Sequence, residues 1–269
     1  MKQQAQWLQL LLGLTRKPVG IKFLLHKEEF DAFEAQAPKN RMSYCTVVRR
    51  AGEGRCQKIH RGHSACMGGA MALGLEKPGP DVISGRRRYL QGAYQDLTVA
   101  HKVSKGMVYC QHETYGLAVM PLEAFQTEPD VVILILNAYQ GMRVAQGYAY
   151  QGGHVRGTSF AGMQAICQEC TSYPYENDCL NLSLMCSGTR MLAGWKEDEL
   201  AVGMPYHLLP QVIQGLKQTV NPLVRDSKKR ELAQGLEQAG LQDALDIHYH
   251  HNYDDGAYLG GPAELPSEA

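Results

Sequence analysis

The sequence has no excess of charge of either sign and no long hydrophobic run. Its 269 residues include 27 Lys and Arg and 27 Asp and Glu, so the formal net charge is zero. A neutral chain has no long-range field that would favour nucleic acid, an anionic membrane or an acidic substrate. The longest apolar run, VVILIL at 131–136, has the length of a strand, whereas a membrane-spanning helix needs about 18 apolar residues or more. We therefore expect neither a nucleic acid nor a membrane as a partner.

The N-terminus has little that resembles an export signal. The apolar run Leu8–Leu14 is interrupted by Gln9 and Gly13, and no small-residue cleavage site follows it. We interpret this segment as an amphipathic helix and expect a cytoplasmic protein. Because cytosolic thiols stay reduced, the eight cysteines are not expected to form disulfides. Reduced thiols that cluster are candidate metal ligands, whereas an isolated cysteine is more often a small buried hydrophobic residue.

Common nucleotide-binding and hydrolase motifs are also absent. The glycine-rich segment QGGHVRGTSF (151–160) lacks the Gly-Lys-Ser/Thr of a Walker A loop and is not a GxGxxG fingerprint after a strand. No Gly-x-Ser-x-Gly occurs, so a serine hydrolase has no support. The same segment could hold an anion or a substrate carboxylate through its backbone N–H groups, helped by His154 and Arg156. These two residues are our substrate-binding candidates.

Apolar patterns predict an α/β or α+β fold, with a central mixed sheet covered by helices in a single large domain. The expected strands lie near residues 19–25, 106–110, 117–120 and 131–136. Continuous apolarity at 131–136 indicates a strand that is buried on both faces. Apolar residues at helical spacing in 206–220 and 228–246 predict two packing helices. We expect a cysteine-containing core at 1–205, a C-terminal helical extension at 206–255 and a disordered tail at 256–269.

Half of the cysteines lie in one segment, CQECTSYPYENDCLNLSLMC (167–186). Its only close pair is Cys167-x2-Cys170, and a CxxC turn lets two thiolates bind one metal centre. Cys179 and Cys186 follow at wider spacing than local iron–sulfur or zinc motifs use. The spacing therefore argues against a self-contained site and predicts that ligands come from elsewhere in the chain.

Two cysteines of the first half lie in turn-like contexts. Cys45 stands in RMSYC, and Cys66 stands in HSACMGG, where glycines follow closely. Glycine beside a ligand suits a cluster, because backbone N–H groups can then approach the sulfur atoms and tune the reduction potential. Both cysteines are therefore candidates to complete the site.

Several longer blocks of the sequence contain these cysteines. They are RMSYCTVVRRAGEG, HSACMGGAMALGL, PLEAFQTEPDVVILILNAYQGMR, FAGMQAICQECTSYPYENDCLNLSLMCSGTR and ELAVGMP. In this order the blocks resemble the DUF169 family of bacterial and archaeal proteins, whose function is largely uncharacterised. The resemblance extends over roughly residues 15–210.

The resemblance implies that only some of the cysteines form a shared set. The family pattern has cysteines where this chain has Cys45, Cys66, Cys167 and Cys186. The cysteines outside that pattern are Cys56, Cys110, Cys170 and Cys179. The chain also departs from the family at Met67, where a C-P-G-G turn has proline, and at Asn137–Met142, where the family has Pro-Ala-Gln-Ala-Met. The second departure puts a shared ligand pocket in doubt.

Four shared cysteines from two distant halves are what a tetrathiolate site requires. Both a [4Fe–4S] cluster and a tetrahedral zinc ion satisfy the count. We favour the cluster, because structural zinc normally staples small domains through paired cysteines and this chain needs no staple. The other four cysteines would either complete a second cluster or be ordinary thiols.

The functional hypothesis is an oxygen-sensitive iron–sulfur redox protein, either an anaerobic reductase or an electron-transfer protein. Its partners would be an electron donor or acceptor protein, a small-molecule substrate, or both. Whether the chain forms a homo-oligomer is left open by the sequence. One alternative is a zinc-binding or thiol-containing ligand-binding accessory protein without redox activity. Another is an enzyme with Cys66 as nucleophile beside His63.

Histidines and arginines near Cys66 and at the C-terminus complete the candidate residues. His63 is our candidate proton donor, because it lies closer in sequence to Cys66 than His60 does. The alternative is a solvated basic loop. Arg86–Arg88 could bind phosphate or simply form an exposed basic helix start. HYHHNYDDGAY (248–258) resembles a metal site, but we interpret it as a surface turn, with a lid or subunit contact as the alternative.

Overall fold

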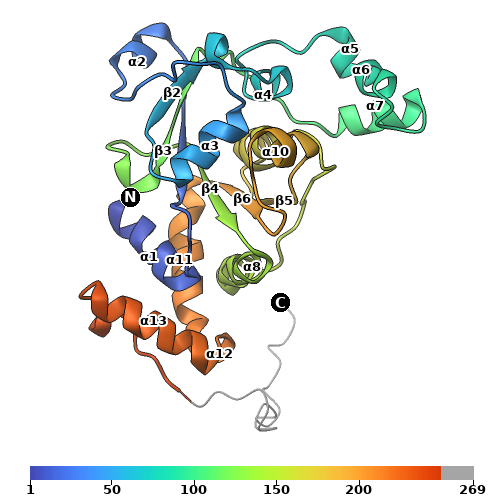
Figure 1. Ribbon diagram of the computed structural model, residues 1–269. Coiled ribbons are helices and arrows are strands. Elements are labelled where there is room, and N and C mark those ends of the chain that lie inside the picture. Colours follow the sequence, from blue (N-terminus) through green and yellow to red (C-terminus); the bar gives the residue numbers. More distant parts are fainter. Residues whose placement is uncertain (250–269) are drawn as a thin grey trace, which may run out of the picture.

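A six-stranded sheet forms the centre of the computed structural model, which describes residues 1–249 (Figure 1). The strands are β1 (Val19–Leu24), β2 (Gln57–His60), β3 (Gly116–Pro121), β4 (Val131–Leu136), β5 (Asn181–Ser183) and β6 (Leu200–Pro205). Their order across the sheet is β2-β3-β1-β4-β6-β5, and every pairing between these strands is antiparallel. Residues 250–269 lie outside the described part of the chain. They include the segment predicted as a tail, 256–269, and residues 250–258 of the HYHHNYDDGAY segment.

The predicted α/β fold class is confirmed, but the sheet is antiparallel and not mixed. A continuously apolar strand such as β4 indicates that both faces are covered, and it does not fix the direction of neighbouring strands. The strands predicted at 19–25, 117–120 and 131–136 are confirmed.

The strand predicted at 106–110 is wrong, because residues 107–110 form a loop. The Cys110 N–H donates to the carbonyl of Ala72 at 2.9 Å, and the Val108 carbonyl accepts from Ser172 Oγ at 2.7 Å. Backbone groups of this apolar stretch therefore bond to a helix and to a side chain instead of a neighbouring strand.

Sequence patterns missed β2, β5 and β6. The edge strands β2 and β5 are short, and only Ile59 of β2 is fully buried. Strand β6 is apolar but contains Gly203, a residue that weakens a strand prediction. Gly203 is required by a close approach: a Cβ there would lie 2.0 Å from the carbonyl oxygen of Cys170.

Helices cover both faces of the sheet. They are α1 (Lys2–Leu12), α2 (Lys27–Ala32), α3 (Tyr44–Gly52), α4 (Met67–Ala72), α5 (Pro80–Ile83), α6 (Arg86–Leu90), α7 (Leu97–Lys105), α8 (Ala138–Gly152), α9 (Tyr173–Asn177), α10 (Ser187–Leu192), α11 (Leu209–Gln218), α12 (Val220–Leu223) and α13 (Asp226–Gln238), together with a π-helix, Ala165–Ser172. In Figure 1, α5, α6 and α7 stand apart from the sheet at the upper right. None of the helices within residues 1–249 has the length and apolar character to cross a membrane.

The two faces of the sheet have different cores, which the alternating residues of β4 separate. Val132, Leu134 and Leu136 pack with apolar residues of α1, α8, α11 and α13; we call this the helical face. Val131, Ile133 and Ile135 pack with α3 and the π-helix; we call this the thiol face, because Cys45, Cys167 and Cys170 belong to its core. This alternation is the period of two expected of a strand.

The C-terminal helices predicted from apolar spacing belong to the helical face. Helix α11 crosses α8 so closely that a Cβ on Gly215 would lie 1.9 Å from the carbonyl oxygen of Gly147. Leu232 and Leu236 of α13 join the same core. The N-terminal amphipathic helix is confirmed as α1, which ends at Gly13 in a left-handed conformation with φ 60°.

Candidate metal centre

The sulfur atom of Cys66 lies at the start of a helix. Cys66 is the N-cap of α4, and its Sγ accepts a hydrogen bond from the Gly69 N–H at 3.4 Å. A Cβ at Gly69 would lie 3.8 Å from the Cβ of Cys167, which is an ordinary van der Waals contact, so α4 packs directly beside Cys167. Cys66 is exposed, so this corner of the site is open to solvent.

Cys45 and Cys186 also lie at helix starts and share one hydroxyl group. Cys45 is the second residue of α3, and Cys186 is the N-cap of α10. The buried Thr189 Oγ1 lies 3.1 Å from the Cys186 Sγ and donates to the Cys45 Sγ at 3.5 Å. The Trp195 Nε1–H donates to the carbonyl of Cys45 at 3.1 Å and holds the first turn of α3 in place.

Cys167 lies in the π-helix, a rare conformation that occurs often at functional sites. Both α3 and α4 pack against this helix. Gln164, just before it, has a left-handed backbone with φ 52°, and its Nε2 donates to the Gly68 carbonyl at 2.6 Å. Met185, which precedes Cys186, is also left-handed, with φ 78°. Non-glycine residues in this region are strained, and here they stand close to two candidate ligands.

The four cysteines of the shared set lie within electrostatic range of one another. The Cys167 thiol interacts with those of Cys45, Cys66 and Cys186, and the Cys45 thiol interacts with those of Cys186 and Cys66. Burial and, after it, the nearby sulfurs raise the pKa of the Cys45 thiol to about 12. Burial, followed by the same neighbours, raises the pKa of Cys167 well above its ordinary value. In the metal-free protein both groups are therefore protonated at neutral pH, and a metal would have to displace these protons.

Four cysteine thiols are a donor set that either an iron–sulfur cluster or a tetrahedral zinc ion can use. Within residues 1–249 no three His, Cys, Asp or Glu side chains are arranged to hold one metal ion. Four sulfurs around one zinc ion would stand about 4 Å apart, because a Zn–S bond is about 2.3 Å long. In a cluster each thiolate binds a different iron, so the ligands are spread more widely.

The other cysteines lie in four different surroundings. Cys56 is exposed before β2, near Lys17 and Glu123, whereas Cys110 is half-buried beside Glu176. Cys170 is fully buried and interacts with Glu169 and Cys45, while half-buried Cys179 interacts with Asp178. The structure does not gather these four residues, and a second cluster stays a prediction.

The candidate proton donor faces another histidine. His63 is half-buried, and its Nδ1 accepts from the His60 N–H at 3.2 Å, with the two ring centroids 4.1 Å apart. Burial, and then His60, lower the pKa of His63, which favours the neutral ring. The loop of His63 still reaches the site, since Ser64 Oγ donates to the carbonyl of Cys66 at 3.0 Å.

The substrate candidates His154 and Arg156 are exposed in the loop after α8. The loop is tied down at Ser159, whose N–H donates to Asn181 Oδ1 at 2.9 Å, and Val155 packs against the helical face. Val155 therefore anchors this loop on the side of the sheet opposite the core that contains Cys45 and Cys167, and the role of His154 and Arg156 stays a prediction.

A buried carboxyl group, Glu169, escaped the sequence patterns. It accepts from the Ala161 N–H at 2.8 Å and from Ser183 Oγ at 2.5 Å. Burial raises the pKa of Glu169, which these hydrogen bonds partly oppose. The residue thus fastens the 161–163 loop and β5 to the π-helix beside Cys170. The motif CQEC contains it, but its partners come from distant segments, so the sequence alone does not reveal its burial.

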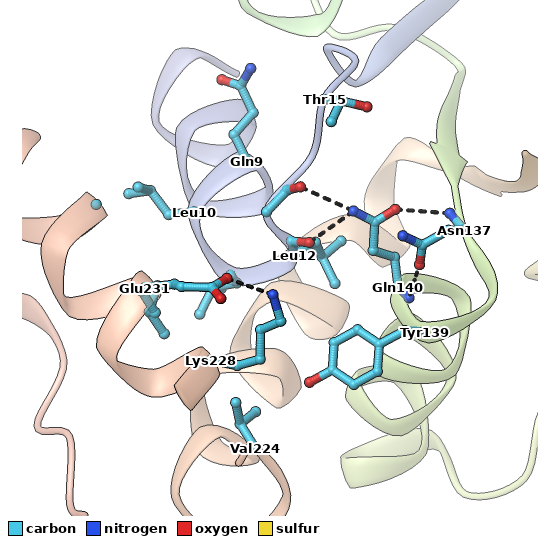
Figure 2. A pocket seen from close by; sticks show the side chains of 14 residues that line it. Gln9, Leu10, Leu12, Thr15, Asn137, Tyr139, Gln140, Val224, Lys228 and Glu231 are labelled. Carbon is cyan, nitrogen blue, oxygen red and sulfur yellow. Dashed lines mark hydrogen bonds and ion pairs between the residues drawn. The ribbon is translucent and has the colours of Figure 1, made fainter. Parts of the chain in front are cut away.

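A pocket of about 510 Å³ on the helical face is lined in part by the block at 137–142 (Figure 2). It lies between α1, the start of α8 and α13. Gln140 Nε2 donates to the carbonyls of Leu12 at 3.1 Å and Gly13 at 3.0 Å, and Asn137 caps α8. Lys228 pairs with Glu231 at 2.6 Å. Gln140 therefore holds α8 against α1, and its amide group is already used, since its Oε1 accepts from the Asn137 N–H at 2.8 Å.

Comparison with known proteins supports the resemblance seen in the sequence blocks. The family model of DUF169, described as uncharacterised ArCR, matches residues 8–215. An uncharacterized protein of Methanocaldococcus jannaschii is 25% identical over 220 residues, which cover 80% of this chain and 93% of the archaeal protein. No solved structure matches the chain. The match over most of its length means that the chain belongs to the DUF169 family.

Proposed function

We propose that this protein is an iron–sulfur redox protein that holds a [4Fe–4S] cluster through Cys45, Cys66, Cys167 and Cys186. One observation carries the proposal: these thiols come from four separate elements and lie within electrostatic range of one another on one face of the sheet. Buried thiols that repel one another when ionised contribute little to packing beyond what apolar residues would supply. A cationic centre bound to them would account for the arrangement.

The residues around the sulfur atoms have definable roles in this proposal. A bound cluster supplies one-electron transfer. The Gly69 N–H and the Thr189 hydroxyl donate hydrogen bonds to sulfur, which stabilises negative charge and so raises the reduction potential. Buried Cys45 and Cys167 hold the site inside the core, and exposed Cys66 leaves one edge open to a partner.

The proposal extends to compartment and partners. An oxygen-sensitive centre with eight free cysteines suits the reducing cytoplasm, where we propose that the protein works. The protein would act either as an anaerobic reductase of a small molecule or as a carrier to a donor or acceptor protein, and a homo-oligomer is compatible with both. His63 remains the candidate proton donor, and His154 and Arg156 remain the substrate candidates.

Metal analysis tests the proposal directly. The protein is purified without oxygen, and iron, acid-labile sulfide and zinc are measured per chain. We expect about four irons and four sulfides for one cluster. A colourless protein with stoichiometric zinc would instead support the zinc-binding accessory protein, and absence of iron after cluster reconstitution would overturn the redox proposal. If iron stayed absent while Cys66→Ala abolished a turnover, the thiol-nucleophile alternative would stand.

Matched variants test the division of the cysteines. We expect Cys66→Ala to lose almost all iron and exposed Cys56→Ala to keep it. Circular dichroism of both metal-free variants checks the fold, which should be unchanged because both side chains are exposed. Cys170→Ala should also retain iron, although its stability falls because the residue is fully buried. Proportional loss of iron in Cys170→Ala would contradict a single four-cysteine site.

A further inference from the structure

A strongly basic pocket lies next to the candidate centre. Its volume is about 870 Å³, and it is bounded by residues 36–42, the C-terminal end of α3 and the 53–57 loop before β2. Its lining includes the cations Lys39, Arg41, Arg49, Arg50 and Arg55. Glu53 is the single acidic residue of the lining. The pocket therefore has a local excess of positive charge in a chain whose net charge is zero.

Several of these cations have no carboxylate partner within the described part of the chain. Arg49 pairs with Glu53 at 2.5 Å. The Arg41 side chain donates to the carbonyl of Ser64, at 2.7 Å from Nη2. The Arg50 side chain reaches only the sulfur of Met42, at 3.8 Å, and within residues 1–249 the side chains of Lys39 and Arg55 form no hydrogen bond or ion pair. Unpaired guanidinium groups around one hollow are suited to phosphate and carboxylate groups, which they bind through paired N–H donors.

The size of the pocket indicates the class of ligand. Small-molecule sites commonly have volumes of about 300–1,000 Å³. This one is within that range, and its lining combines the cations with only a few apolar residues, such as Ala37, Pro38 and Met42. A small molecule with several negative charges fits this lining better than an apolar ligand does.

Two structural links join the pocket to the candidate ligands. Helix α3 runs from Cys45 near its start to Arg49 and Arg50 at the pocket. The pocket wall at Met42 is bonded to the loop that leads to Cys66: the Met42 N–H donates to the His63 carbonyl at 2.9 Å, and the Ala65 N–H donates to the Met42 carbonyl at 2.9 Å. A ligand in the pocket would thus contact the elements that position Cys45 and Cys66.

We propose that this basic pocket binds a small-molecule anion that carries either phosphate groups or several carboxylates. We also propose that the bound anion lowers the reduction potential of the centre, because added negative charge disfavours the more negative reduced state. The second statement rests on the proposed function, whereas anion binding itself does not.

Calorimetric titration tests the binding, with inorganic pyrophosphate and citrate as probes of the two ligand chemistries. The double variant Arg50→Gln/Arg55→Gln should weaken binding of the preferred anion by roughly tenfold or more, since it removes two charge-assisted contacts. The control Lys105→Gln removes an exposed cation at the end of α7, away from the pocket lining, and should change the affinity less than twofold. Equal weakening by the control, or no binding of either anion, would overturn the proposal.

A second readout uses a thiol in the lining. Cys56 is exposed and lines the pocket, whereas half-buried Cys179 does not line it. Saturating anion should slow iodoacetamide modification of Cys56 several-fold relative to Cys179, as measured by mass spectrometry of the peptides. Equal rates with and without anion would contradict binding at this place.

Titrations on metal-free and iron-loaded protein separate the two proposals. Anion binding to a protein that never takes up iron would uphold the pocket and overturn the cluster. Iron loading without anion binding would uphold the cluster and overturn the anion-binding pocket. In the loaded protein, a redox titration should give a lower potential with anion present, and an unchanged potential would overturn the link between the two sites.

Discussion

The two faces of the sheet differ in how regularly they are built. The helical face is covered by α1, α8, α11 and α13, whose apolar residues follow helical spacing. The thiol face has short helices, a π-helix and left-handed non-glycine residues, which include Gln164 and Met185 beside the candidate ligands and Asp178 at the end of α9. Its core holds buried thiols and, next to them, the buried carboxyl group of Glu169. Packing alone explains the first face and does not require the irregularities of the second.

This difference indicates where function lies in the molecule. Strained backbone reduces stability, so it persists where a site needs it. Buried ionisable groups alone do not separate the two faces, because the helical face buries Arg143 and Lys229. Polar side chains on the helical face, such as Gln140 and Thr219, bond to backbone carbonyls and hold helices together. On the thiol face, Thr189 bonds instead to two sulfur atoms.

Two glycine substitutions, one on each face of the sheet, should lower the free energy of unfolding more than the other substitutions proposed. Gly203→Ala places a methyl group against the Cys170 carbonyl, and Gly215→Ala places one against the Gly147 carbonyl. Each should lower the free energy of unfolding by about 3 kcal/mol or more, because backbone must move to relieve the overlap. For Gly215 the better helix propensity of alanine offsets about 1 kcal/mol. Chemical denaturation measures both.

The same pair tests whether the faces are functionally distinct. Gly203→Ala should also reduce iron content per folded chain, since it displaces the π-helix that carries Cys167. Gly215→Ala should leave iron content unchanged. Equal iron loss in both variants would mean that the two faces are not independent.

Alkaline pH should weaken the metal-free protein through the thiol face. The pKa of the Cys45 thiol is raised from 9.0 to about 12, so above pH 9 the unfolded chain releases a proton that the native protein retains. The free energy of unfolding should therefore fall as pH rises from about 9 to about 12. The decline should be shallower in Cys45→Ala, whereas Cys56→Ala, with a less buried thiol, should follow the wild type more closely. Denaturation curves between pH 8 and pH 10.5 measure these slopes, and identical slopes would contradict burial of the Cys45 thiol.

Two threonine substitutions should give the smallest effects. Thr189→Val removes the hydroxyl between the Cys45 and Cys186 sulfurs, and Thr219→Val removes one that accepts from Arg143 Nη2 at 2.9 Å. Each should lower the free energy of unfolding by about 1 kcal/mol. Only Thr189→Val should lower the reduction potential of the iron-loaded protein, because only it removes a hydrogen bond to sulfur. A redox titration of both iron-loaded variants measures the reduction potential. A similar shift of the potential in Thr219→Val would contradict a local effect of the Thr189 hydroxyl on the sulfur atoms.

Much of the helical face was predictable from the sequence, and much of the thiol face was not. The apolar run of β4 and the helical stripe of α11 indicated elements that the structure contains. The edge strand β2 escaped because three of its four residues are only partly buried, and the loop at 107–110 was taken for a strand because it is apolar. The spacing of Cys167 and Cys170 drew attention to a pair, whereas Cys170 packs against β6 and Cys167 faces the other three shared cysteines.

By itself, the sequence determined the apolar periods, the helix starts and the resemblance that selected four of the eight cysteines. Those properties are local, because each depends on residues a few positions apart. Only the tertiary structure decided that Cys45, Cys66, Cys167 and Cys186 lie close together, that Glu169 is buried, and that Arg50 and Arg55 share a pocket without enough carboxylates. These properties depend on which distant segments pack against the antiparallel sheet. The spacing of residues along the chain does not encode how close such segments come in space.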